Sequence, residues 1–279
     1  MGMLVIGIIL GLIVIAVYGA QRKQRKILND QKSGLRHIKQ VKLLISLLQK
    51  HRGLSAAWCQ GDSSVMAELN LLKSDIRKVV IELEGHGLTQ QFDRFAAFQD
   101  HWSRLAKHKD DLSAESSFKQ HTHMIANVLY LLEDVAEKYH LSQEFLPEFT
   151  HVGYLWRELL AVTESVGQSR AVGTSAVTAK QCSSVERIRL KFLRQHITHV
   201  SEKVLKQMKT GSDSELNKFI DQGVQHTRYL TSAIVNEILE PEEIVMQRSD
   251  YFDLATQTMD SLLSIFDHQV LQIELAVTK

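Results

Sequence analysis

The chain has 279 residues with only 2 prolines and 2 cysteines, and its formal net charge is +1. A chain of this length forms one elongated domain or two packed ones. The balanced charge supplies no basic field that would attract nucleic acid, and Cys59 and Cys182 are too far apart in the sequence for a CxxC metal or redox motif.

The first segment of the chain has the composition of a membrane helix. Residues 1–20 contain no charged side chain and are rich in isoleucine, leucine and valine, and about 20 such residues are enough to cross the hydrocarbon core of a bilayer. A basic linker, residues 21–34, follows and contains Arg22, Lys23, Arg25 and Lys26. The positive-inside rule therefore predicts a single-pass helix in the inner (cytoplasmic) membrane of a bacterium, with the C-terminal domain facing the cytoplasm.

Two further features belong to the same segment. Val17 and Gly19 form a weak cleavage site, so a secretory signal is the alternative, although a signal carries its positive charges before the apolar run. Gly7 and Gly11 form a GxxxG pair, which permits close helix pairing in lipid. We therefore expect a homodimer.

Residues 35–279 are predicted to form one all-helical domain. Apolar residues recur at intervals of three and four, and no run alternates with the period of a strand. We expect helices over residues 31–60, 62–85, 95–105, 113–139, 183–209, 214–239 and 242–276, with a further long helix that begins at Pro147 and carries Arg170. Because the connections are short, the predicted fold class is all-α, with an N-terminal transmembrane helix followed by two four-helix bundles that share long helices.

Two arginines stand at positions of buried helix faces. Arg52 ends the apolar face formed by Ile38, Val41, Ile45 and Leu48, and Arg170 continues the face formed by Val152, Trp156, Leu159, Thr163 and Val166. A guanidinium keeps its charge inside a protein, so a buried arginine requires an anion. Small residues follow each arginine and leave room for a ligand, so the two side chains are predicted to clamp one small planar anion.

The alternative is that each arginine forms an ion pair with a carboxylate. The facing apolar stripes of the second and fourth predicted helices contain no aspartate or glutamate, and Glu164 lies off the stripe of Arg170. A carboxylate partner is therefore not evident from the pattern.

Catalytic and metal-binding motifs are absent from the sequence. It contains no phosphate-binding glycine loop, HExxH or GxSxG motif, so we expect no enzyme and no cofactor. His196 and His199 are spaced for shared metal ligation, but no acid accompanies them on the next turn, and we expect no metal site. Cys59 lies on the Arg52 face and is interpreted as a packed thiol, with a redox sensor as the alternative. The basic run Arg187, Arg189, Lys191, Arg194 is interpreted as a solvated helix face.

Two short stretches resemble the signatures of the nitrate- and nitrite-sensing (NIT) domain family. Residues 47–56, with the sequence LLQKHRGLSA, are similar to the first signature, a helix with an arginine, a glycine and small residues. Residues 164–173, with the sequence ESVGQSRAVG, are similar to the second, which has a glycine, an arginine and a further small residue. The order and separation of the stretches, within residues 35 to 275, also match the family.

The resemblance implies a sensor that holds nitrate or nitrite between helices and signals by helix movement. It assigns Arg52 and Arg170 as ligand-binding residues, with Ser55, Gly173 and His51 beside them. A further arginine from the second half contributes in the family, and Arg187 and Arg228 are the candidates. We expect a membrane-anchored member without an output domain that signals to a separate, unidentified protein. The alternative function is a membrane-tethered helical adaptor with no ligand.

Overall fold

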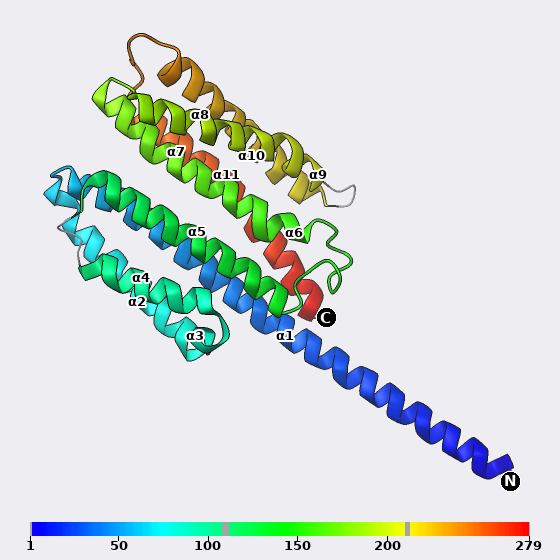
Figure 1. Ribbon diagram of the computed structural model, residues 1–279. Helices are drawn as coiled ribbons and strands as arrows, with labels where there is room; N and C mark the ends of the chain where they lie inside the picture. The colour runs from blue at the N-terminus through cyan, green and yellow to red at the C-terminus, as the bar shows by residue number, and fades with distance from the viewer. Residues whose placement is uncertain (1, 108–111, 210–212, 279) are drawn as a thin grey trace.

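The computed structural model describes residues 2–107, 112–209 and 213–278, without the side chains of residues 2–5, 7 and 8. Helices make up most of this part of the chain and no strand occurs in it, so the predicted all-α class is confirmed. The ribbon in Figure 1 shows the helices lying roughly along one another in two groups, with a long N-terminal helix that extends away from the body.

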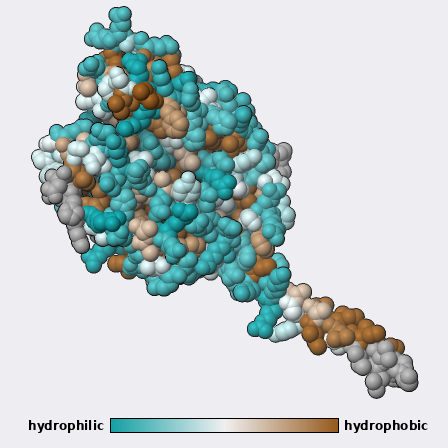
Figure 2. All heavy atoms as spheres, in the orientation of Figure 1, coloured by the Kyte–Doolittle hydropathy of each residue, from teal (hydrophilic) through white to brown (hydrophobic). Residues whose placement is uncertain are grey.

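The long helix is α1, which runs without interruption over Gly2–Cys59. Its first half is an exposed stem that carries apolar side chains at its surface, seen as the brown rod in Figure 2, whereas the surface of the body is largely hydrophilic. Within the described residues, no helix meets the length and hydropathy that a membrane crossing requires, so the expected transmembrane helix over residues 1–20 is not confirmed. The side chains of residues 1–5, 7 and 8 of that segment, Gly7 of the predicted GxxxG pair among them, lie outside the described residues.

The first group of helices surrounds the second half of α1. It contains α2 (Met66–Gly85), α4 (Asp93–Lys107) and α5 (Ala114–Lys138), and the short α3 (Leu88–Gln91) joins α2 to α4. Asp62 and Ser113 cap the turns that open α2 and α5 by accepting hydrogen bonds from backbone amides. The predicted apolar face of α1 (Ile38, Val41, Ile45, Leu48) is buried here against α2 and α5.

The second group is formed by the C-terminal half of the chain. Its members are α6 (Val152–Tyr154), η3 (Leu155–Leu159), α7 (Leu160–Ala179), α8 (Ser184–His199), η4 (Val200–Val204), α9 (Leu205–Gln207), α10 (Ser214–Ala233), η5 (Ile234–Leu239) and α11 (Arg248–Thr278). The three η segments are π-helical turns: η3 joins α6 to α7, η4 joins α8 to α9, and η5 follows α10 directly. The prediction that Pro147 opens the long helix was wrong, because this residue lies in the loop before α6.

The two groups meet along four helices. α1 contacts α7 and α11, and α5 contacts α7 and η3. α7 is consequently buried around most of its circumference, and residues 162–167 are buried without a break. A polar residue on this part of α7 is enclosed between the groups whichever way it points.

Candidate functional site

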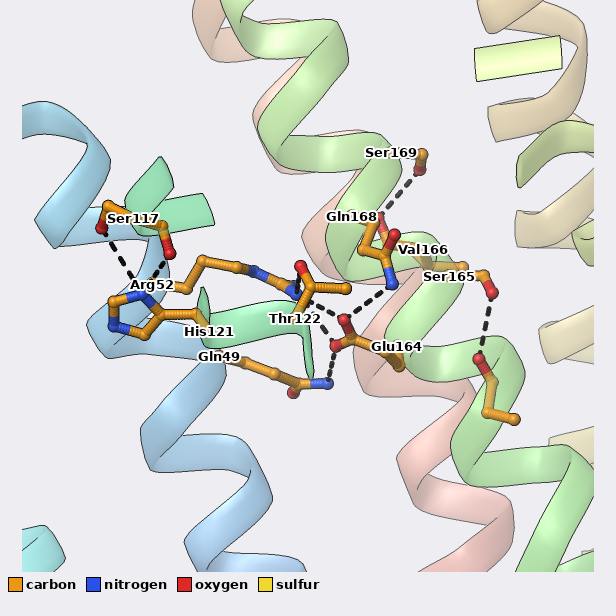
Figure 3. Close-up of polar contacts among 11 residues, drawn as sticks. Gln49, Arg52, Ser117, His121, Thr122, Glu164, Ser165, Val166, Gln168 and Ser169 are labelled. Atoms are coloured by element: carbon orange, nitrogen blue, oxygen red, sulfur yellow. Dashed lines mark hydrogen bonds and ion pairs between the residues drawn. The ribbon is translucent and has the colours of Figure 1, made fainter. Parts of the chain in front are cut away.

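Arg52 lies at the junction of the two helix groups. It is the last large residue of the buried face of α1, and only 2% of its surface is exposed. Its guanidinium makes a two-pronged contact with the carboxylate of Glu164 on α7: NH1 donates to Oε1, and NH2 donates to Oε2 at 3.2 Å (Figure 3). NH1 also donates to Thr122 Oγ1 of α5 at 3.3 Å, and the ring of Phe118 lies 5.4 Å from the guanidinium carbon.

Glu164 is therefore the carboxylate partner that the sequence pattern did not reveal. It is 4% exposed, and besides Arg52 it accepts hydrogen bonds from Gln49 Nε2 of α1 and Gln168 Nε2 of α7, each at 2.9 Å. The ion-pair alternative therefore holds for Arg52, although the sequence pattern made no carboxylate partner evident. The reason is that α7 is buried on nearly every side, so a residue off its main apolar stripe still faces another helix.

Gly167 allows the Arg52 side chain to lie directly against α7. A Cβ atom at this position would stand 3.2 Å from Arg52 NH2 and 3.5 Å from the terminal methyl of Met259. The contact with Arg52 is tighter than side chains normally make, whereas the one with Met259 is an ordinary packing distance, so a larger residue would push the guanidinium away from α7. Gly167 therefore allows the guanidinium of Arg52 to pack against α7.

Arg170 lies one turn after Gly167 and differs from Arg52 in its partners. Its NH1 donates to Thr256 Oγ1 at 2.9 Å, and its guanidinium lies 4.8 Å over the ring of Phe252, both on α11. Among the described residues, no carboxylate oxygen lies within 4.0 Å of it. Burial lowers the pKa of Arg170, the charge of Arg52 lowers it further, and Asp260 and Glu164 oppose the shift. The charges of the two arginines thus oppose each other, and the carboxylates of Asp260 and Glu164 counteract this effect on Arg170.

The residues expected beside the arginines have other contacts. His51 Nδ1 lies 2.8 Å from His121 Nε2 and 3.2 Å from Ser55 Oγ. His51, Ser55 and His121 line a cavity of about 20 Å³ at the end of the first helix group, which is room for about one water molecule. Gly173 packs against Tyr251, since an added Cβ would stand 2.3 Å from that ring. The structure places these residues in helix packing beside the arginines.

His121 belongs to the same polar cluster. Its Nδ1 donates to the carbonyl oxygen of Ser117 at 2.7 Å, which leaves Nε2 to accept from His51. Burial lowers the pKa of His121 to about 4, the Ser117 carbonyl opposes the shift, and the charges of Arg52 and His101 add to it. The ring is therefore neutral at pH 7.

The two further arginines expected from the sequence, Arg187 and Arg228, have other surroundings. Arg228 is exposed, and Arg187 donates to the carbonyl oxygen of Leu239. Arg189 of α8 instead lies 5.2 Å over the ring of Phe118, which also contacts Arg52. Its basic run was interpreted as a solvated helix face, whereas Arg189 is partly buried in the structure, and nothing in the run distinguishes this arginine from its neighbours.

No part of the chain that the structure describes brings together three or more side chains able to ligate a metal. The charged groups at the junction are arginines and one glutamate. Hydrogen bonds and charge are the means by which such a set can hold an anion.

The chain is similar to a known family in its sequence and to a solved structure in its fold. A family model described as nitrate and nitrite sensing matches residues 43–274. A solved structure, described as the NasR transcription antiterminator, is similar over 95% of this chain and 74% of its own chain, with a TM-score of 0.65 and 18% sequence identity. At that identity the likeness concerns the fold alone. No curated protein matches the sequence.

Proposed function

Because the nitrate- and nitrite-sensing model matches most of its length, the chain belongs to that family, and we propose that it binds nitrate or nitrite between Arg52 and Arg170. The family is one of sensing domains. The anion would lie where α1, α7 and α11 meet, with one arginine from α1 and one from α7. Arg189 of α8 is the third basic group near this position, in place of Arg187 or Arg228.

One observation carries the proposal: a buried arginine fork already holds a planar, singly charged group. The carboxylate of Glu164 offers two oxygens in one plane to NH1 and NH2 of Arg52. Nitrate and nitrite offer the same kind of edge, and a guanidinium donates to it in the same plane. Arg170 supplies a second guanidinium, and the described residues leave it without an ion pair.

The location of the arginines also supports a signalling role. An anion held by both side chains would favour one relative position of α1 against α7 and α11, so binding would shift the population of helix arrangements. α1 continues from the site into the N-terminal stem (Figure 1), which gives a movement of α1 a path out of the body. We propose that a separate signalling protein receives this movement, and that the chain works as a homodimer.

We further propose that the stem anchors the protein in the inner membrane, with the body in the cytoplasm. The support is the exposed apolar surface of the stem, followed by a basic segment. The exposed apolar residues are Ile6, Ile9, Leu10, Leu12, Ile13, Val14, Ile15 and Val17. A reporter fused to the C-terminus should be active in the cytoplasm, and activity confined to the periplasm would reverse the orientation.

Calorimetry on the purified full chain tests the ligand. Nitrate or nitrite at millimolar concentration should release or absorb heat in a saturable manner. Arg170→Ala should weaken binding at least roughly thirtyfold, since a charge-assisted contact contributes about 2 kcal/mol. Arg170→Lys should restore binding only in part, because an ammonium cannot reproduce the fork. A parent protein without a saturable heat for either anion would refute nitrate and nitrite as ligands.

The Arg52–Glu164 ion pair favours a second candidate, a helical adaptor that binds a protein and no ligand. In an adaptor the arginines are structural, and Arg52 with its carboxylate fits that role. Arg170 does not, since its guanidinium contacts a hydroxyl and a ring. The calorimetric experiment separates the two, because an adaptor gives no anion-binding heat in any variant.

A further inference from the structure

The fork of Arg52 is occupied by a group of the protein itself. Both of its terminal nitrogens donate to Glu164, and the pair is buried with 2% and 5% of the two side chains exposed. We propose that Glu164 is an internal anion that competes with the external one for Arg52 and so sets the concentration at which the sensor binds its ligand. This inference rests on the proposed function, which it extends by naming a residue that determines affinity.

The competition follows from the geometry of the donors. A guanidinium can make a two-pronged contact through its two terminal nitrogens or through Nε and one terminal nitrogen, and a planar anion fills the edge that it takes. Glu164 takes the edge formed by the two terminal nitrogens, and Gly167 lies close to NH2, which belongs to both edges. A second planar anion therefore cannot use both terminal nitrogens while Glu164 does, and binding at that edge requires exchange.

Exchange is feasible because Glu164 has other donors. Gln49 Nε2 and Gln168 Nε2 each donate to its carboxylate at 2.9 Å (Figure 3), so the group keeps hydrogen bonds when it releases Arg52. A buried carboxylate without such partners would be too costly to release. The two amides come from α1 and α7, and they hold Glu164 on the junction in either arrangement.

The charges of this small set favour a monovalent ligand. Arg52, Arg170 and Arg189 carry three positive charges, and Glu164 and Asp260 carry two negative charges, so one monovalent anion completes the balance. Asp260 of α11 acts on Arg170 through space, but none of its oxygens lies within 4.0 Å of that guanidinium. Since Glu164 is part of the chain and lies beside Arg52, its effective concentration at the guanidinium is high, and an external anion must compete with it for the same donors.

The exchange also links binding to a movement between helices. Arg52 belongs to α1 and Glu164 to α7, and their ion pair joins the two helix groups. When an external anion replaces the carboxylate, this direct connection between α1 and α7 is lost and a connection through the ligand takes its place. The internal anion thus defines the ligand-free arrangement, and the ligand defines the other.

Removing the carboxylate tests the competition. Nitrate binding is measured by calorimetry on the full chain for the parent, for Glu164→Gln and for Glu133→Gln, a matched control. Glu133 of α5 also faces an arginine of the other helix group, Arg157 Nε of η3 at 2.8 Å, but the side chain of Arg157 is 68% exposed and the pair does not include Arg52 or Glu164. We expect Glu164→Gln to bind nitrate at least tenfold more tightly than the parent, and Glu133→Gln to bind as the parent does.

A second variant covers the case in which Glu164→Gln does not fold. Glu164→Asp keeps the charge on a side chain one methylene shorter, which weakens the two-pronged contact, and it should bind nitrate several-fold more tightly than the parent. Binding that is equal or weaker in the folded variants overturns the inference and leaves the sensor function intact. Binding in Glu164→Gln alone supports the inference and removes nitrate as the ligand of the parent. No binding in any protein overturns both.

Discussion

Replacing Arg52 by alanine is expected to destabilise the protein strongly, because the change leaves Glu164 buried without its counter-ion. Arg52 and Glu164 are 2% and 4% exposed, and the remaining donors to the carboxylate are the amides of Gln49 and Gln168. Breaking a buried ion pair by removing one partner costs about 3–5 kcal/mol. In a chain of this size such a loss lowers the melting temperature by roughly 2–4 °C per kcal/mol, so we expect a fall of about 6–20 °C.

The assay is thermal and urea denaturation of the parent and of three variants: Arg52→Ala, Arg52→Met and the double variant Arg52→Met/Glu164→Met. Replacing both charges by apolar residues of similar size removes the orphaned carboxylate, so the double variant should recover most of the lost stability. Helical content should stay near that of the parent, because the apolar face of α1 below Arg52 is unchanged. A loss below about 1 kcal/mol for Arg52→Ala would refute the view that this pair is enclosed between the helix groups.

Two further outcomes follow from the structure. The pKa of His121 in the folded protein is about 4, below the ordinary value of 6.5, so the unfolded chain takes up a proton at a higher pH than the folded one. This histidine therefore lowers the free energy of unfolding as the pH falls from about 6.5 to 4, by about 3 kcal/mol in all. His121→Asn should flatten that part of the pH dependence in urea denaturation, and an unchanged slope would contradict the assignment. Gly173→Ala should destabilise by about 1–3 kcal/mol, because its Cβ would overlap the Tyr251 ring and force α7 away from α11, and a variant as stable as the parent in denaturation would disprove this tight contact.

The helices were predictable from local patterns. The face of Ile38, Val41, Ile45 and Leu48 has helical spacing, and the structure buries all four residues on α1. Ser113 was expected to cap a helix and does so. Pro147 was expected to open one and does not, because the turns at residues 139–151 use several residues before α6 begins. Local chemistry is thus reliable for capping side chains and weaker where a proline suits both a loop and a first helical turn.

The candidate site was predictable only in part. The position of Arg52 at the end of a buried face follows from its spacing, and its burial is as expected. His51 and Ser55 lie next to it in the sequence but line a small cavity with His121. Arg189 was taken for a solvated residue and lies over the ring that also contacts Arg52.

The sequence by itself determined the helical class, the buried face that ends in Arg52 and the two stretches that resemble the family signatures, because each depends on residues within a few turns of one another. Only the tertiary structure decided that Glu164, 112 residues away, occupies the fork of Arg52, and that Arg170 has no such partner within the described part of the chain. The physical reason is that these contacts depend on the rotation and axial offset of α7 against α1. Many side chains distributed over both helix groups set that packing, and no local pattern encodes it.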